Sequence, residues 1–212
     1  MSCPICQKRK AKRFCPAKGE NICSVCCGTE REVTIDCPSD CTFLAASRRN
    51  EQERRAIDWS KVPFPETKIP TSFVAAQQKL ILAISYGICA YARDNRPVVD
   101  ADAVASLQTL AEAYRTLSSG LYYEKPPEYL LQRELYERIK AAIEEFKRDQ
   151  AREPQIAPVR DSDIRDTLIF LTQLGSIRSN GRPKGRAFLD FLRSQFKPEE
   201  FSKPAPNLLV MP

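Results

Sequence analysis

The sequence predicts a small cysteine-rich module followed by an all-α helical bundle. Three observations support this fold class. Eight of the nine cysteines lie within residues 3–41. From residue 71 onward, apolar residues recur at steps of three and four, which is the period of an amphipathic helix. Because strand-type alternation does not appear in that part of the sequence, we expect the chain beyond the cysteine-rich segment to be helical.

The cysteine-rich segment has the spacing Cys3-x2-Cys6-x8-Cys15-x7-Cys23-x2-Cys26-Cys27-x9-Cys37-x3-Cys41. Close cysteine pairs let sulfurs converge on one ion, and eight thiolates satisfy two tetrahedral zinc sites. A segment of about forty residues buries too little apolar surface to fold unaided. Structural zinc supplies on the order of 10 to 16 kcal/mol in small finger peptides. We therefore expect two structural Zn²⁺ ions and an unfolded module without them.

Two other uses of so many cysteines are a disulfide framework and redox chemistry. Disulfides require an oxidising compartment, and residues 1–13 contain a basic run but lack the apolar segment of a secretion signal. The pair Cys23 and Cys26 has the spacing of dithiol oxidoreductases, but those place it after a strand of a βαβ unit, and no βαβ pattern surrounds it. Zinc in a reducing, cytoplasmic compartment is therefore the favoured interpretation.

The segments Cys3-x2-Cys6, Lys12-Arg-Phe-Cys-Pro16 and Ile22-Cys-Ser-x2-Cys27, with the terminal x3-spaced pair, resemble the zinc fingers of the HIT, MYND and B-box group. The resemblance implies a cross-brace with two zincs and a protein-binding function. It also implies one site of Cys3, Cys6, Cys23 and Cys27 and another of Cys15, Cys26, Cys37 and Cys41. Spacing alone allows Cys26 and Cys27 to be exchanged. The chain departs from the group in having no histidine and in carrying Lys18 where a ligand is usual.

The formal charge of +6 overstates the basic character of the metallated chain. Two zinc ions add four positive charges and eight thiolates remove eight, which lowers the balance to about +2. The basic run of the module has two interpretations, a phosphate-binding strip or cations that neutralise the adjacent thiolates. We favour neutralisation for these residues: Lys8, Arg9, Lys10, Lys12 and Arg13.

We divide the chain into a finger at residues 1–45, an exit helix and proline-rich linker at 46–70, a bundle of about five helices at 71–197 and a tail at 198–212. Ser39 or Asp40 is expected to cap the exit helix, which runs to about residue 56. Prolines 63, 65 and 70 predict an extended linker. The apolar residues 208–211 are expected to dock on the bundle.

Periodicity predicts the five helices of the bundle. The first spans about residues 71–95 and is apolar on most sides, which indicates a central position. The second begins at Asp100 or Asp102 and ends at Gly120, and the third begins at Pro126–Pro127. The fourth is capped within residues 161–163, and the fifth begins at Pro183. The isolated Cys89 is expected to pack in the core.

One basic stretch suggests a different function. Residues 181–186, Gly-Arg-Pro-Lys-Gly-Arg, resemble the core of an AT-hook, whose Gly-Arg-Pro unit lies in the minor groove of A·T-rich DNA. The resemblance implies that Arg182 enters the groove while Lys184 and Arg186 contact phosphates. The alternative is a plain connection in which Gly181 ends one helix and Pro183 begins the next.

The sequence therefore predicts a zinc-binding, non-enzymatic interaction or adaptor protein, in which the finger binds an unknown protein partner on a helical scaffold. Histidine is absent, and neither a P-loop nor a nucleophile elbow is present. The apolar run at residues 80–92 is too short to span a bilayer, so no membrane anchor is expected. A DNA- or RNA-associated regulator that uses the finger or the loop around Arg182 is the alternative.

Overall fold

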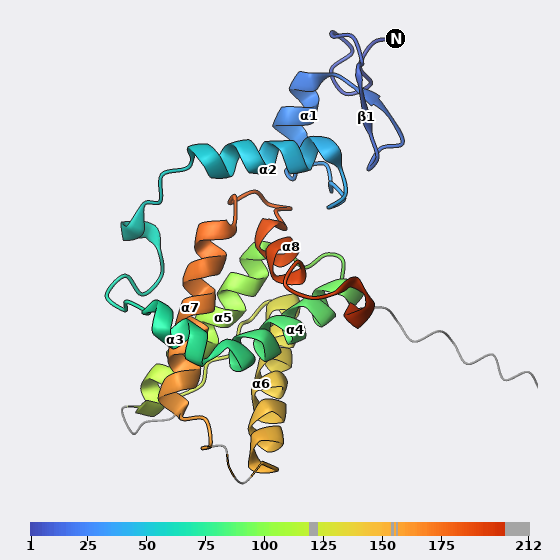
Figure 1. Ribbon diagram of the computed structural model, residues 1–212. Coiled ribbons are helices and arrows are strands. Elements are labelled where there is room, and N and C mark those ends of the chain that lie inside the picture. Colours follow the sequence, from blue (N-terminus) through green and yellow to red (C-terminus); the bar gives the residue numbers. More distant parts are fainter. Residues whose placement is uncertain (119–122, 154, 156, 202–212) are drawn as a thin grey trace, which may run out of the picture.

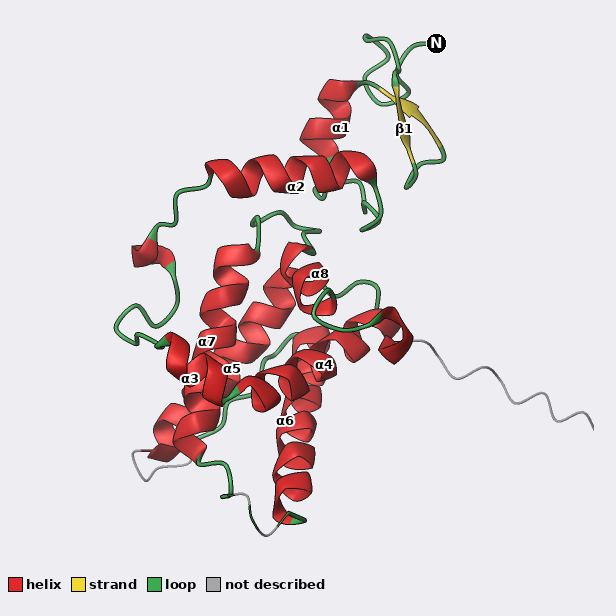
Figure 2. Ribbon diagram, in the orientation of Figure 1, coloured by secondary structure: helices red, strands yellow, loops and turns green. Residues whose placement is uncertain are grey.

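The computed structural model describes residues 1–118, 123–153, 155 and 157–201, and these residues are mostly helical (Figures 1 and 2). A short hairpin near the N-terminus is formed by β1 (Arg13–Cys15) and β2 (Glu20–Ile22). The helices are α1 (Ser24–Glu30), α2 (Thr42–Arg54), α3 (Thr71–Ala76), α4 (Gln78–Asp94), α5 (Asp100–Ser118), α6 (Leu130–Ala151), α7 (Asp161–Arg178) and α8 (Ala187–Arg193), with single 3₁₀ turns at Trp59–Lys61 and Pro198–Phe201.

The N-terminal module folds around its own cysteines. Strands β1 and β2 pair antiparallel, with Phe14 opposite Asn21, and the turn between them passes through Gly19 at φ 68°. Helix α1 follows β2 directly. The buried cluster of the module consists of four cysteines and two isoleucines, namely Cys3, Cys15, Ile22, Cys23, Cys26 and Ile35. So little hydrocarbon cannot offset the entropy of ordering the chain, which agrees with the need for a metal.

The remaining helices share one apolar core. Helix α5 packs against α6 and α7, and α4 packs against α6 and α8, while α2 lies across one end of these helices (Figure 1). The predicted apolar stripes point inward: Leu80, Ile84 and Ile88 of α4 are fully buried, as are Leu135 and Ile139 of α6. The part of the chain that the structure describes contains no helix long and apolar enough to cross a membrane.

Several predicted helix boundaries differ from the structure. The helix expected over residues 71–95 is interrupted at Gln77, whose ψ of 17° breaks the helical geometry between α3 and α4. Helix α6 begins at Leu130, three residues after the Pro126–Pro127 pair that was expected to open it. The predicted end at Gly120 and the apolar residues 208–211 lie outside the described residues.

Two predicted helix starts are also wrong. Cys41, not Ser39 or Asp40, occupies the N-cap of α2, and Ser39 instead donates its hydroxyl to Asp190 of α8 at 2.7 Å. Helix α8 begins at Ala187 and not at Pro183. Tertiary contacts between the module and the bundle occur at both places: Ser39 donates to Asp190, and Lys184, directly after Pro183, donates its N–H to the Glu32 carbonyl.

Candidate metal centre

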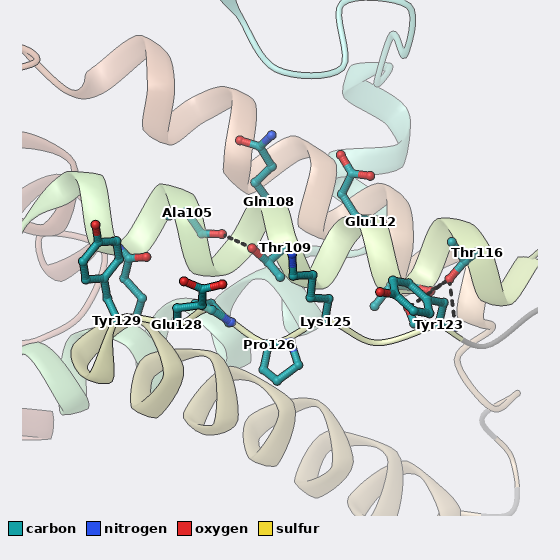
Figure 3. A pocket seen from close by; sticks show the side chains of 13 residues that line it. Ala105, Gln108, Thr109, Glu112, Thr116, Tyr123, Lys125, Pro126, Glu128 and Tyr129 are labelled. Carbon is teal, nitrogen blue, oxygen red and sulfur yellow. Dashed lines mark hydrogen bonds between the residues drawn. The ribbon is translucent and has the colours of Figure 1, made fainter.

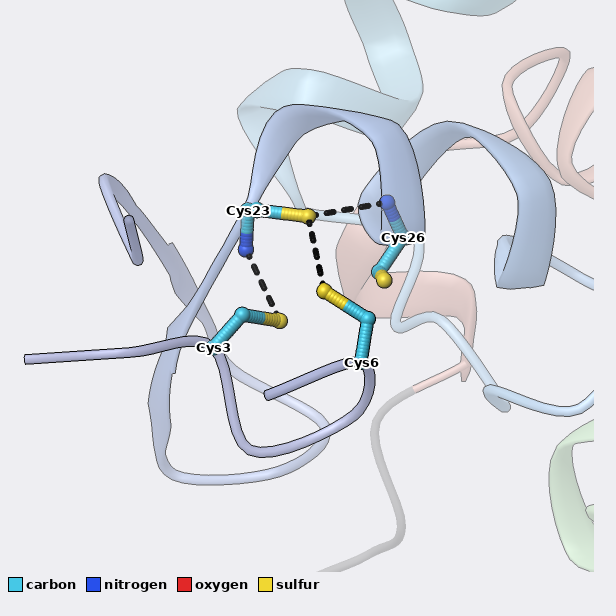
Figure 4. Close-up of side chains that lie close together, drawn as sticks. All are labelled: Cys3, Cys6, Cys23 and Cys26. Carbon is cyan, nitrogen blue, oxygen red and sulfur yellow. Dashed lines mark hydrogen bonds between the residues drawn. The ribbon is translucent and has the colours of Figure 1, made fainter. Parts of the chain in front are cut away.

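Four cysteines of the module bring their sulfurs together. The Sγ atoms of Cys3, Cys6, Cys23 and Cys26 all lie within 4.8 Å of one another, and Figure 4 shows them pointing toward a common centre. The Sγ atoms of Cys6 and Cys23 are 3.9 Å apart. Four thiolates around one point are the donor set of a structural tetrahedral zinc site. This is the one group of three or more potential ligands found at such distances in the described residues.

Two tight local structures position these four sulfurs. The first is the turn after Cys3, where the Gln7 N–H donates to the Cys3 carbonyl at 2.7 Å and Gln7 adopts φ 53°. The second is the strand-to-helix junction, where Cys23 is the N-cap of α1 and Cys26 lies in the first helical turn. Main-chain N–H groups also reach the sulfurs, from Cys23 to Cys3 and from Cys26 to Cys23, both at 3.3 Å.

The electrostatics of the cluster favour a bound cation. Main-chain N–H groups of Lys8 and Arg9 lower the pKa of the Cys6 thiol to about 6. Burial raises the pKa of Cys26, and the neighbouring thiols Cys23, Cys6 and Cys3 raise it further, to about 12. Deprotonation of the first thiol is therefore favourable, whereas deprotonation of the last is disfavoured by the negative charge of the others. A bound divalent cation offsets that negative charge, because metal binding and thiol deprotonation are coupled.

The structure distinguishes Cys26 from Cys27. The fourth sulfur beside Cys3, Cys6 and Cys23 is that of Cys26. The family resemblance implied Cys27 as this fourth ligand, and the structure does not show that set. Adjacent helix residues point about 100° apart, and Cys27 accordingly leaves the cluster. Its Sγ accepts from Nη2 of Arg31 at 3.6 Å.

The other four cysteines of the module are Cys15, Cys27, Cys37 and Cys41. Burial raises the pKa of Cys37, the main-chain N–H of Glu32 lowers it, and the charges of Cys41 and Cys15 raise it again. The charges of Cys41 and Cys15 thus act on Cys37, but these sulfurs do not form a group as close as the first one. Cys89 is buried in the helical core among apolar residues, and burial raises its pKa to about 12, which suits the packing role expected for it.

The three basic residues of the AT-hook-like loop contact the protein itself. Arg182 donates Nη1 to the Arg31 carbonyl at 2.7 Å, and Lys184 donates Nζ to the Thr34 carbonyl at 2.7 Å. Arg186 binds the carbonyls of Arg96 and Ala92, at 2.8 and 3.2 Å. The loop thus connects the module to the bundle.

Sequence reasoning missed the residue at the centre of this connection. Glu32 is 1% exposed and has φ 54°. Its carboxylate accepts from Arg48 Nη2 at 2.5 Å and from Asn180 Nδ2 at 2.7 Å, and its carbonyl accepts from the Lys184 N–H at 2.8 Å. Its partners lie up to 154 positions away in the sequence, so the local sequence pattern does not predict its role.

Two cavities of more than 500 Å³ lie on the bundle. One of about 560 Å³ lies between α5 and the segment that precedes α6, and Figure 3 shows its mixed polar lining, including Gln108, Glu112 and Lys125. The other, of about 740 Å³, lies between the linker and α7, where Trp59, Ile69 and Phe170 make its lining largely apolar. Ser60, in the lining of the second cavity, donates its hydroxyl to Oδ1 of Asp58 at 2.7 Å.

Comparisons with protein-family models, with curated proteins and with solved structures found no match. The resemblance to the HIT, MYND and B-box group therefore depends on the cysteine spacing alone. The four-sulfur cluster is the observation from which a function can be argued.

Proposed function

We propose that this chain is a non-enzymatic zinc-binding interaction protein. Cys3, Cys6, Cys23 and Cys26 bind one Zn²⁺, which fixes the turn after Cys3 against the start of α1. The observation that carries the proposal is the convergence of these four sulfurs within 4.8 Å. A site with four protein ligands leaves no position for water or substrate, so the metal has a structural role.

A second Zn²⁺ is proposed at Cys15, Cys27, Cys37 and Cys41. These are the cysteines that remain in the module, and the charges of Cys41 and Cys15 act on the pKa of Cys37. The guanidinium of Arg31 beside Cys27 would offset the negative charge of a four-thiolate site. Both sites need reduced thiols, so the proposed compartment is reducing.

The zinc module is proposed to present a surface to a partner protein, with the helical bundle as its support. Exposed apolar side chains on the module, Phe14, Val25 and Val33, are suited to such a contact. The nucleic-acid alternative is not adopted, because Arg182, the residue that would enter the groove, and Lys184 already donate to main-chain carbonyls of the module.

Cobalt substitution tests the metal sites. Co²⁺ added to the reduced, metal-free chain should produce the visible bands of tetrahedral coordination and the near-ultraviolet sulfur-to-cobalt charge transfer. Cys26→Ser should reduce both signals by about half, because one of two sites loses a ligand, and Cys89→Ser is the matched control that should leave them unchanged. Spectra of octahedral cobalt, or equal effects of the two variants, would refute the assignment.

The interaction role has its own test. Tagged wild-type chain and the Cys26→Ser variant are compared for the proteins that each retains from a cell lysate. A partner that binds the wild type and not the variant supports the role of the finger. An identical set of retained proteins would show that the module does not select partners.

A further inference from the structure

A small cavity at the junction of the module and the bundle is surrounded by arginines. Its volume is about 190 Å³, which is below the 300 to 1,000 Å³ typical of sites for drug-sized ligands. It lies between α4, α8 and the segment that leads into α2. The charged and polar side chains that line it are Arg93, Arg96, Arg186, Arg193, Ser39 and Asp190.

The carboxylates near the cavity do not balance these cations. Arg93 pairs with Asp94 at 2.7 Å, and Arg96 pairs with Asp36 at 3.0 Å. Asp190, the one acid in the lining, is itself bound by Arg48 at 2.5 Å, a guanidinium outside the lining. The acid of the cavity is therefore partly neutralised from the opposite side, by a guanidinium that it shares with Glu32.

Two of the four arginines have no carboxylate partner among the described residues. Arg186 donates to main-chain carbonyls, and Arg193 lies over the ring of Phe201, with 5.9 Å from its guanidinium carbon to the ring centroid. Holding like charges around one small cavity is unfavourable, and a bound anion relieves that repulsion.

The donors that line the cavity favour one class of anion. The four arginines come from α4 (Arg93), the segment after α4 (Arg96), the loop before α8 (Arg186) and the last residue of α8 (Arg193). A guanidinium presents a planar fork that matches a tetrahedral oxyanion. A terminal phosphate offers three free oxygens to such a ring of donors, whereas a nucleic-acid backbone phosphate offers two and is normally bound by a strip of cations along the strand.

We propose that this cavity binds the phosphate group of a phosphomonoester, carried by a phosphorylated serine or threonine of a partner protein. The identity of the carrier rests on the interaction function proposed above, while phosphate binding itself does not. Arg193 is the principal ligand. Arg186 exchanges part of its contact with the carbonyls of Arg96 and Ala92 for the phosphate oxygens, and Arg93 and Arg96 do the same with Asp94 and Asp36.

Titration calorimetry of the zinc-loaded full chain tests the proposal with three probes, inorganic phosphate, O-phosphoserine and a random-sequence DNA duplex. Both phosphate probes should bind saturably with one site per chain. Arg193→Gln should weaken the affinity for both phosphate probes by about tenfold or more. A hydrogen bond to a charged group contributes roughly 1.5 to 3 kcal/mol, and about 1.4 kcal/mol corresponds to a tenfold change in Kd. Arg193→Lys, which keeps the charge, should recover part of the loss.

The matched control is Arg152→Gln, which removes the same charge from a side chain that is 79% exposed at the end of α6. It should change the affinities by less than about twofold, as expected for a charge distant from the cavity. Absence of saturable binding, or equal losses for Arg152→Gln and Arg193→Gln, would overturn the site. Binding of inorganic phosphate without O-phosphoserine, or tighter binding of the duplex, would overturn the phosphorylated-protein ligand.

The cobalt spectrum of Arg193→Gln separates this proposal from the zinc assignment. An unchanged spectrum with lost phosphate binding supports the cavity. Phosphate binding in a chain that gives no tetrahedral cobalt spectrum would refute the zinc proposal and leave the phosphate site standing.

Discussion

Glu32 is the side chain on which the junction between module and bundle most depends. A residue other than glycine at φ 54° is unfavourable by itself, so it persists only where its surroundings require it. In this structure, the hydrogen bonds that the Glu32 carboxylate accepts from Arg48 and Asn180 hold the residue in this conformation. The Arg48 guanidinium also binds Asp190, and these two carboxylates raise its pKa against the opposing effect of burial.

Glu32→Gln should therefore lower the free energy of unfolding by about 2 to 4 kcal/mol, since it leaves a buried guanidinium with one carboxylate instead of two. Urea denaturation measures the change. Asp149→Asn is the control, because the pair of Asp149 with Arg152 has side chains 63% and 79% exposed and such pairs contribute less than about 1 kcal/mol. Equal effects of the two substitutions would contradict the account of this junction.

Asp100 is a buried carboxylate that connects two helices. It is 1% exposed and accepts from the N–H groups of Phe188 and Leu189, at 3.1 Å each, at the start of α8. Burial raises its pKa from 3.8 to about 6, although those N–H groups oppose the rise. The folded chain thus binds this proton more tightly than the unfolded chain, and the stability that the proton confers is lost as pH rises through about 6.

Asp100→Asn keeps an acceptor oxygen for both N–H groups but cannot ionise. The stability of the wild type relative to this variant should fall by up to about 3 kcal/mol between roughly pH 4 and pH 7, from the shift in pKa. Urea denaturation of both proteins across this range measures the difference, in which the acid sensitivity of their identical cysteines cancels. Parallel pH profiles would show that Asp100 does not carry this shift.

At the scale of the elements, close helix packing explains why particular small residues are present. A Cβ atom at Gly175 of α7 would lie 2.8 Å from Cγ2 of Val104 and 2.9 Å from Cε1 of Phe188. Helix α7 therefore approaches α5 and α8 as closely as it does because this position lacks a side chain. At Gly28 of α1, by contrast, an added Cβ would have no neighbour within 4 Å.

Gly175→Ala should destabilise the protein by about 1 to 3 kcal/mol, because buried side chains must move to admit the methyl group. Gly28→Ala should be neutral or stabilise by up to about 1 kcal/mol, since alanine favours the helix. Thermal unfolding of both variants tests the contrast, and a larger loss for Gly28→Ala would contradict the packing described for α7.

The elements also show which parts of the fold can be read from the sequence. The recurrence of apolar residues at steps of three and four predicted helices with a buried face. The structure confirms this for α6, where Leu135 and Ile139 are fully buried, because the helical period is a local property of the sequence. Local sequence preference gave the wrong N-cap for α2. Ser39 was expected to cap this helix, but its hydroxyl donates to the distant Asp190 instead. The choice of Cys26 over Cys27 likewise required the direction of α1 relative to Cys3, which spacing does not contain.

At the scale of the whole molecule, the buried residues form two separate cores. The cysteine cluster forms one, and the apolar residues of the helices form the other. The loop at residues 179–186 joins them through Arg182 and Lys184. We propose that the first core depends on metal, whereas the second depends on buried hydrocarbon, so the two should respond differently to a chelator.

Metal removal should therefore unfold the module and leave the bundle folded. In hydrogen exchange followed by mass spectrometry, a chelator should remove the protection of residues 1–41 and of the loop at 179–186, while amides of α5 and α7 remain protected. Addition of excess zinc is the control and should restore both regions. Protection of the module that persists in chelator would mean that it folds without metal.

The central claim is that the cysteines of the module bind metal ions and so give the N-terminal segment its shape. Native mass spectrometry of the full chain, purified under reducing conditions without chelator, tests it most directly. The account predicts the mass of the chain with two zinc ions, and with one ion in Cys26→Ser. A metal-free mass, or a mass reduced by two hydrogens for each disulfide formed among these cysteines, would contradict it.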